Sequence, residues 1–176
     1  NAVYASPYND YVNSFVNKLF TNQSESLALV YNVTKDRFLK KKVHEGIFSI
    51  LYVLEYGINK DFKDSITYAT EYMKMKCDFT NENEEKTVNE DVNSMIDRFK
   101  NFNDWLLKCT SITTYPLSKE LYGISSKSYK FQTSMALILP ALYRKIYLQG
   151  EKYSSFSFEK IMDSIQYSLS NSFLEK

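Results

Sequence analysis

The chain has 176 residues, 44% hydrophobic and 24% charged, a composition typical of a folded globular protein rather than a disordered one. Its 22 basic and 21 acidic residues leave a net charge of +1, so no overall field draws it to nucleic acid or to an anionic membrane. Only four glycines and three prolines interrupt it, too few for the turns of a sandwich or barrel of short strands, which favours helices in one domain.

The start of the chain is considered apart from the fold. Asn1 and Ala2 resemble a scar left by tag removal, and Val3-Tyr4-Ala5 has small or branched residues where a signal peptidase prefers them. We therefore interpret residues 1–5 as a tag scar or a signal-peptide remnant, and residues 6–176 as a single helical domain. This interpretation favours a secreted or periplasmic protein, with a cytoplasmic location as the alternative.

The first predicted helix begins at Ser6-Pro7. Serine can cap the amides at a helix start, and proline is tolerated at the first helical position. Apolar residues then recur every three or four positions and should form one buried stripe that ends near Phe20. The stripe consists of Tyr8, Val12, Phe15 and Leu19.

A second predicted helix follows Asn22, which together with Glu25 resembles a capping box. The helix could reach Gly57, its expected C-cap, and would then have about 35 residues and a length of about 52 Å. That is long for a small domain. Because Asn32-Val33-Thr34 are poor helix formers together, we expect a kink or a break there.

The later part of that helix, around residues 36–57, is hydrophobic on nearly every side. Between Gly46 and Gly57 only Ser49 and Glu55 are polar. A helix with no face left for water runs through the middle of a bundle, or has one flank against a pocket or a partner. We therefore predict that it is the central helix. Its main stripe consists of Leu39, Val43, Ile47, Ile50, Leu54 and Ile58.

Two further helices are predicted on either side of an acidic loop at residues 78–87. The first covers residues 62–77 and has Asp61 as its N-cap. Its stripe consists of Phe62, Ile66, Ala69, Met73 and Cys77. The second covers residues 88–109 and should pack along its whole length, because its apolar spacing alternates between four and three without a miss. Its stripe consists of Val88, Val92, Met95, Phe99, Phe102, Leu106 and Cys109.

The remaining chain predicts two helices after a long connection. Residues 110–125 form that connection, with one helical turn expected at 117–122. A helix around residues 126–149 contains Pro140, which removes a backbone hydrogen bond and should bend it. A last helix is expected after Ser157, with a stripe of Phe158, Ile161, Ile165, Leu169 and Phe173. The sequence therefore predicts an all-α, single-domain bundle of about six helices.

The apolar runs are too short to cross a membrane. The longest uncharged one, residues 135–143, is about half of the ~20 residues that a spanning helix needs. We therefore expect no transmembrane segment, and the balanced charge predicts no nucleic-acid partner.

The two cysteines, Cys77 and Cys109, test this helical arrangement. If residues 62–77 and 88–109 form a simple helical hairpin, the two cysteines lie about 30 Å apart along the helices. A disulfide requires Cα atoms within about 7 Å. We therefore expect two buried thiols, since a bridge would require the 78–87 loop to run back along the preceding helix.

The single histidine, His44, limits the chemistry that this chain can carry. No two-histidine metal site, zinc-protease motif or glycine-rich phosphate loop is present, so we expect no metal and no cofactor. His44 and Glu55 share a helix face about 16 Å apart, and an enzyme acting through both in one cleft is a hypothesis. The simpler interpretation is a histidine near solvent and a glutamate at the bundle surface. An interior Glu55 would need a tyrosine hydroxyl or Arg144 as its partner.

Aromatic residues are the most unusual part of the composition, with 15 tyrosines and 12 phenylalanines. Several tyrosines are spaced four residues apart, so each pair lies on one face of its helix, away from the main stripe. Tyrosine combines a large apolar ring with a hydroxyl that needs a partner, which suits a half-wet cavity, an interface or the edge of a core. The pairs are Tyr52 and Tyr56, Tyr68 and Tyr72, and Tyr143 and Tyr147.

These patterns predict a non-catalytic helical binding module that uses a tyrosine-rich surface or cleft for a protein partner or a small apolar ligand. The candidate binding residues are these six tyrosines together with Phe48, Glu55 and His44. The alternative for the tyrosines is that they contact neighbouring helices. Two other functions stay open, namely an effector-binding or dimerisation domain of a cytoplasmic regulator, and the enzyme acting through His44 and Glu55.

Overall fold

The computed structural model describes residues 6–58, 63–111, 114–118 and 129–148, together with 159–160, 163–164 and 167–168. These residues are helical or irregular and contain no strand, which confirms the predicted all-α class. The α-helices are α1 (Pro7–Thr21), α2 (Ser26–Val30), α3 (Lys35–Leu39), α4 (Lys42–Tyr56), α5 (Ser65–Glu82), α6 (Glu85–Cys109) and α7 (Met135–Tyr143). A π-helical turn, η3 (Arg144–Leu148), directly follows α7.

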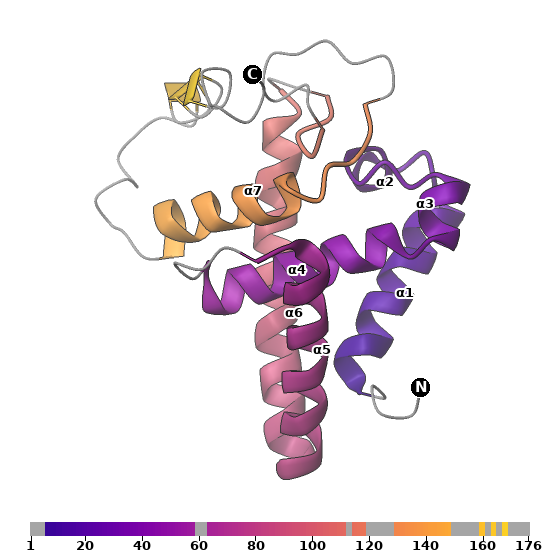
Figure 1. Ribbon diagram of the computed structural model, residues 1–176, viewed down its shortest axis with the longest axis vertical. Helices are drawn as coiled ribbons and strands as arrows, with labels where there is room; N and C mark the ends of the chain where they lie inside the picture. Colours follow the sequence, from indigo (N-terminus) through magenta and orange to yellow (C-terminus); the bar gives the residue numbers. More distant parts are fainter. Residues whose placement is uncertain are drawn as a thin grey trace.

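Helix α4 is the centre of the fold, as its sequence predicts. Eleven of its 15 residues are buried, and it contacts α1, α3, α5, α6 and α7. Figure 1 shows α5 and α6 along the long axis of the molecule, with α4 and α7 crossing them and α1 at one flank. A helix with neighbours on so many sides has no face left for water, which explains its run of apolar residues.

The polar residues within that apolar run have partners on neighbouring helices. Ser49 Oγ donates a hydrogen bond to the backbone oxygen of Ser65, 2.8 Å away at the start of α5. Glu55 forms ion pairs with Lys76 of α5 and Arg98 of α6. A buried polar group left without a partner costs roughly 1–3 kcal/mol, so these contacts favour one placement of α4 against α5 and α6.

The chain before α4 breaks twice, so the long helix predicted between residues 22 and 57 is divided into α2, α3 and α4. The break expected at 32–34 is present: Asn32 has φ 47°, and the Thr34 side chain caps α3. A second break, at Lys41 with φ 57°, was not predicted. Gly57 ends α4 with φ 79°, as expected.

The prediction of a capping box at Asn22 is wrong. Asn22 is the C-cap of α1, and Glu25 is the N-cap residue of α2. The two side chains do meet, because Asn22 Nδ2 donates to Glu25 Oε1 at 3.1 Å. Their contact spans the turn between the helices and does not cap the start of a helix. The start of α1 follows the prediction, since the Ser6 side chain accepts a hydrogen bond from the Asn9 amide.

Helices α5 and α6 form a hairpin whose turn is much shorter than predicted. Helix α5 starts at Ser65, where Asp64 Oδ1 accepts from the Thr67 amide at 2.7 Å. The predicted N-cap, Asp61, lies outside the described residues. Helix α5 continues to Glu82 and α6 begins at Glu85, so most of the acidic segment 78–87 is helical. A charged segment with few glycines can extend a helix when its side chains face water.

The buried face of α5 also differs from the predicted stripe. Ile66 is 55% exposed, whereas Tyr68 and Tyr72 are fully buried. The face toward α4 carries the large tyrosine rings, whose burial removes more apolar area from water than that of an isoleucine. Helix α6 follows its prediction closely, since its stripe is buried except for the half-buried Val92.

The proline-containing helix begins later than predicted, at Met135 rather than near residue 126. Pro140 lies inside α7 and cannot donate a backbone hydrogen bond. The helix changes to the wider π-helical pattern at Arg144, four residues further on. Proline and π-turns are both common causes of irregular helix geometry.

The last predicted helix is described at only a few positions. Glu159, Lys160, Asp163, Ser164, Tyr167 and Ser168 are exposed and helical, while the expected apolar stripe lies outside the described residues. Of the turn expected at 117–122, only 117 and 118 are described, and they are not helical. None of the helices in the described ranges is both long and apolar enough to cross a membrane.

Candidate functional site

The first two tyrosine pairs belong to the contact between α4 and α5. The Tyr52 ring centroid lies 5.2 Å from that of Tyr56 and 4.8 Å from that of Tyr68. Tyr72 lies beside Phe48, with 6.5 Å between the ring centroids. Tyr68 and Tyr72 are fully buried, so they pack helices together and do not line a surface.

The third pair, Tyr143 and Tyr147, joins α7 and η3 to α6. Its two rings lie 5.1 Å apart, and Tyr143 lies 5.4 Å from Phe102 and 5.6 Å from Trp105. Tyr147 reaches the same tryptophan at 6.4 Å. Burial raises the pKa of both tyrosines above the ordinary value. The six tyrosines therefore form two separate clusters.

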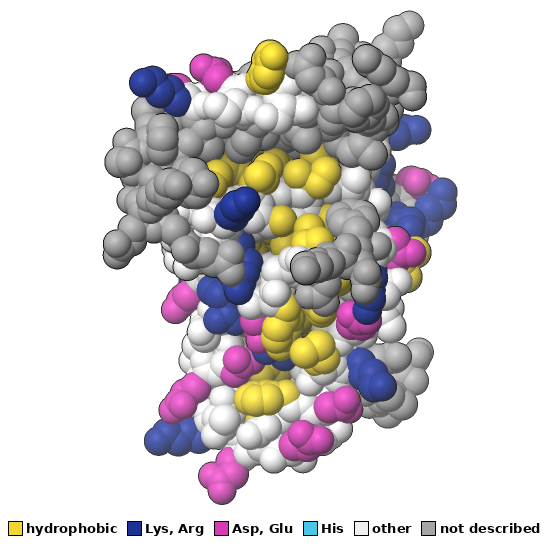
Figure 2. All heavy atoms as spheres, turned by 60° about the vertical axis from the view of Figure 1, so that its left-hand side comes forward, with side chains coloured by type: hydrophobic (Ala, Val, Ile, Leu, Met, Phe, Trp, Pro, Cys, Tyr) yellow, Lys and Arg dark blue, Asp and Glu magenta, His cyan; other side chains and the backbone are white. Residues whose placement is uncertain are grey.

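Two of these tyrosines keep a substantial exposed area. Tyr56 and Tyr147 are each 40% exposed. Figure 2 shows one face of the molecule, where hydrophobic side chains gather in an interrupted stripe along the long axis, with acidic and basic side chains on both sides. Interrupted apolar area of this kind is common on soluble proteins and does not by itself mark a binding site.

Glu55 lies in a partly buried network of charges between α4, α5 and α6, in which Lys76 is the buried member. Lys76 Nζ contacts Glu55 Oε1 at 2.6 Å and Asp91 Oδ2 at 2.7 Å, and Arg98 Nη2 contacts Glu55 Oε2 at 3.2 Å. Two cations face two carboxylates, so the cluster is electrically balanced. The predicted partners of an interior Glu55 were a tyrosine hydroxyl or Arg144. Burial and a hydrogen bond with Glu55 raise the pKa of Tyr56, so a tyrosine is among the partners, whereas Arg144 donates to the backbone oxygen of Leu54 at 2.7 Å.

Aromatic rings enclose the Lys76 ammonium on several sides. The nearest is that of Tyr8, whose centroid lies 5.1 Å from Nζ. The Tyr8 hydroxyl donates to Asp91 Oδ2 at 2.7 Å. Burial opposes ionisation of Asp91, but hydrogen bonds from Lys76 and Tyr8 outweigh it and lower the pKa of that carboxyl. The other rings within 6 Å are those of Tyr56, Tyr72 and Phe79.

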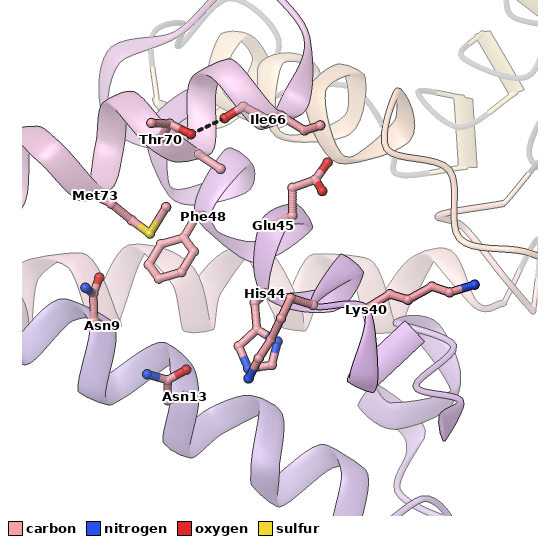
Figure 3. A pocket seen from close by; sticks show the side chains of 11 residues that line it. Asn9, Asn13, Lys40, His44, Glu45, Phe48, Ile66, Thr70 and Met73 are labelled. Atoms are coloured by element: carbon pink, nitrogen blue, oxygen red, sulfur yellow. Dashed lines mark hydrogen bonds between the residues drawn. The ribbon is translucent and has the colours of Figure 1, made fainter. Parts of the chain in front are cut away.

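A pocket of about 310 Å³ lies at the other end of α4, between α1, α4 and α5. Its size is at the lower end of the range for small-molecule sites, roughly 300–1,000 Å³. Figure 3 shows its side chains converging from the three helices and from the turn before α4. They are Asn9, Asn13, Lys40, Lys41, His44, Glu45, Phe48, Ile66, Ala69, Thr70 and Met73.

The lining of this pocket combines polar and apolar side chains. Asn9 and Asn13 come from α1, and in Figure 3 Asn13 lies near His44 at the start of α4 while Asn9 lies near Phe48 and Met73. Phe48 and Met73 lie side by side between α4 and α5 (Figure 3). The pocket can therefore meet an apolar group and a polar group of the same molecule.

Glu45 is the only acidic residue among the described lining residues, and its carboxylate already has partners. Lys42 Nζ contacts Glu45 Oε2 at 2.9 Å, and Ser65 Oγ donates to Glu45 Oε1 at 2.7 Å. Lys40 pairs with Asp36 at 2.8 Å, and its side chain extends away from His44 in Figure 3. Lys41 is therefore the lining cation nearest to the histidine.

His44 is buried, in contrast to the solvent-facing position suggested by its place near a helix end. It is 6% exposed, and its Nδ1 atom is sealed from solvent with no hydrogen-bond partner among the described residues. Burial, assisted by the nearby charge of Lys41, lowers the pKa of His44 to about 4. The imidazole is therefore neutral at physiological pH.

The structure separates His44 from Glu55, the pair of the enzyme hypothesis. His44 lines the pocket near the start of α4, whereas Glu55 lies near its end and is not among the described lining residues. Of the nine candidate binding residues, the pocket includes His44 and Phe48. The α1 asparagines were missed because they lie off the apolar stripe, and their four-residue spacing was the available signal.

Two other hollows lie in the described surface, one at the end of α6 and one between α1, α2 and α6. Neither has a described lining residue with a buried polar atom that lacks a hydrogen-bond partner. Within the described ranges, no group of three or more histidine, cysteine, aspartate or glutamate residues could hold a metal ion. Comparison with protein-family models, with curated proteins and with solved structures found no match to this chain.

Proposed function

We propose that this protein is a non-catalytic binding module whose ligand is a small molecule held in the pocket between α1, α4 and α5. The observation that carries the proposal is His44, a buried imidazole in the lining of the pocket. Its Nδ1 atom is sealed from solvent and has no hydrogen-bond partner in the described part of the chain, so the other ring nitrogen, Nε2, is the one left to meet a ligand. A pocket lined by both polar and apolar side chains supports binding of a small amphipathic molecule.

The enzyme hypothesis has less support. His44 and Glu55 lie in different parts of the molecule, and Glu55 is held by Lys76 and Arg98. A general base must come within hydrogen-bond reach of the same substrate as its partner acid, and Glu55 is not among the described lining residues of the pocket that His44 lines.

A protein partner is the second candidate. It is favoured by the partly exposed rings of Tyr56 and Tyr147 and by the apolar stripe in Figure 2. Tyrosine is enriched in protein interfaces because its ring packs while its hydroxyl stays hydrated. The clustering of the other four tyrosines in helix contacts weakens this candidate relative to the pocket.

Ligand-observed NMR with a set of small-molecule fragments tests the pocket. Thr70 is an exposed lining residue on α5, so Thr70→Trp should place an indole over the pocket without disturbing the core. Asp78→Trp is the matched control, because Asp78 is exposed on the same helix but is not a lining residue.

We expect several fragments to bind the unmodified protein and the Asp78→Trp variant, and to lose binding in Thr70→Trp. Equal binding to all three proteins would place the ligand elsewhere and contradict the proposal. Circular dichroism of each variant shows whether it keeps its helices.

A further inference from the structure

The pocket lies against the N-terminus of α4, where backbone amides are left without intrahelical partners. Lys41 is the N-cap residue and has a left-handed backbone conformation. Among the described residues no side chain makes a capping hydrogen bond there. The first amides of a helix carry partial positive charge and attract anions, and α4 is long enough for that effect.

The Lys41 ammonium adds a full positive charge at the same end. It lies 5.8 Å from the centroid of the Phe38 ring, and that ring lies 6.0 Å from the His44 ring. The charge of the neighbouring Glu45 carboxylate is offset by Lys42, and Ser65 donates a hydrogen bond to it. The polar end of the pocket therefore has an excess of positive charge.

His44 supplies a second, independent feature at that end. It is more than nine-tenths buried and lines the pocket, and its Nδ1 finds no acceptor in the described part of the molecule. A proton on Nδ1 would be a buried donor without a partner, so the neutral ring should carry its proton on Nε2. The ring then offers a hydrogen-bond donor to a ligand.

The apolar residues of the lining are suited to an apolar chain. Phe48 is buried, Met73 is half-buried, and Ile66 is 55% exposed although it is a large hydrophobic residue. When a ligand covers an isoleucine side chain at a pocket edge, apolar area is removed from water, which favours binding. The unexpected exposure of Ile66 thus has an explanation in a bound molecule.

We propose that the ligand of this pocket is a small amphipathic anion, with its charged head beside Lys41 and His44 at the N-terminus of α4. Its apolar body lies between Phe48, Met73 and Ile66. This inference rests on the proposed function and adds the ligand class to it. A charged head group and an apolar chain in one molecule match the mixed polar and apolar lining of the pocket.

Three eight-carbon probes separate charge from apolar character: octanesulfonate, octanol and octyltrimethylammonium. Octanesulfonate stays anionic at every pH used, so changes in its affinity report on the protein alone. Calorimetry should show that octanesulfonate binds more tightly than octanol, and that octyltrimethylammonium binds most weakly.

Variants of Lys41 and His44, the residues placed beside the charged head of the ligand, provide a second test. Lys41→Gln should weaken octanesulfonate binding about three- to fivefold, and His44→Phe should weaken it about tenfold. Octanol binding should change little in Lys41→Gln. Lys86→Gln, the same change at an exposed residue far along the α5–α6 hairpin, should leave all affinities unchanged.

The pH dependence of octanesulfonate affinity is a readout that a purely structural role of His44 would not change. An anion beside His44 must raise its pKa, so octanesulfonate affinity should increase as the pH falls from 7 toward 5. The other charged groups in the described lining are Lys40, which pairs with Asp36, Glu45, which pairs with Lys42, and Lys41. His44→Phe should remove this pH dependence.

Equal binding of the three probes, or no binding of octanesulfonate, would overturn the anion inference. The fragment experiment decides separately whether the pocket binds small molecules at all. A pocket that binds octanol and neutral fragments but not octanesulfonate would keep the proposed function and refute the ligand class.

Discussion

Lys76 Nζ lies 2.6 Å from Glu55 Oε1 inside the helical bundle, and this ion pair ties the central helix to α5. The lysine is buried among aromatic rings, and its second carboxylate partner, Asp91, extends the tie to α6. Removing one member of a buried charge network leaves the others without compensation, which costs more than the pair itself is worth.

Lys76→Met should therefore destabilise the protein strongly, by about 3–5 kcal/mol, because Glu55 and Asp91 lose their common cation. Urea unfolding followed by circular dichroism measures the change. Lys40→Met is the control, since the Lys40–Asp36 pair is exposed and its loss should have little effect. Equal destabilisation by the two substitutions would show that the charge network around Lys76 has no special role.

Asp91 should make the protein acid-sensitive. Its folded-state pKa lies below the ordinary value because hydrogen bonds from Lys76 and Tyr8 outweigh the effect of burial. The carboxylate therefore stabilises the fold fully above the unfolded-state pKa of about 4, and this stabilisation is lost as the pH falls through the lower folded-state value. Between pH 7 and 3 the free energy of unfolding should therefore depend less steeply on pH in Asp91→Asn than in the unmodified protein. An unchanged pH dependence in that variant would contradict this assignment.

Gly46 permits the close approach of Phe131 to the central helix. A Cβ atom at position 46 would overlap the buried Phe131 ring. Gly46→Ala should therefore lower the free energy of unfolding by about 1–3 kcal/mol, despite the higher helix propensity of alanine. Phe131→Leu removes the clashing ring atoms, so Gly46→Ala should cost less in that background, and the two substitutions should have non-additive effects on the free energy of unfolding. Simple additivity in this double-mutant cycle would rule out the clash.

Cys77 and Cys109 are both buried thiols. Burial raises the pKa of Cys109 to about 12, so very little of it is thiolate at pH 8. Mass spectrometry after iodoacetamide treatment should find Cys109 unmodified in the folded protein and fully modified in urea. Rapid modification of Cys109 under native conditions would mean that the α6 C-terminus opens readily.

The sequence predicted the elements whose apolar spacing was regular and whose ends carried strong signals. Helix α6 follows its pattern of four and three, and Gly57 ends the central helix as expected. The break at Lys41 was not predictable, because it depends on a lysine with a positive φ angle, which local propensity disfavours.

The candidate site was harder to predict because it depends on contacts between distant segments. The pattern places the tyrosines of α5 away from the main stripe, with either a binding surface or a contact with neighbouring helices as their role. Tyr68 and Tyr72 form the contact with α4, and Ile66 of the predicted stripe is exposed. The periodicity of a sequence shows which residues share a face of a helix. It does not show which of two faces meets a neighbouring helix when both faces carry large apolar residues. The His44 pocket in addition needs α1 beside α4, a relationship that no local pattern contains.

The most direct test of the pocket uses the imidazole signal of His44. Because the chain has one histidine, its ring proton signals need no assignment among others. In the free protein this signal should titrate with a pKa of about 4. Fragments that bind the protein should shift the signal at pH 7, and should fail to shift it in Thr70→Trp. Fragments that bind tightly while the His44 signal stays in place would contradict the assignment of the binding site to this pocket.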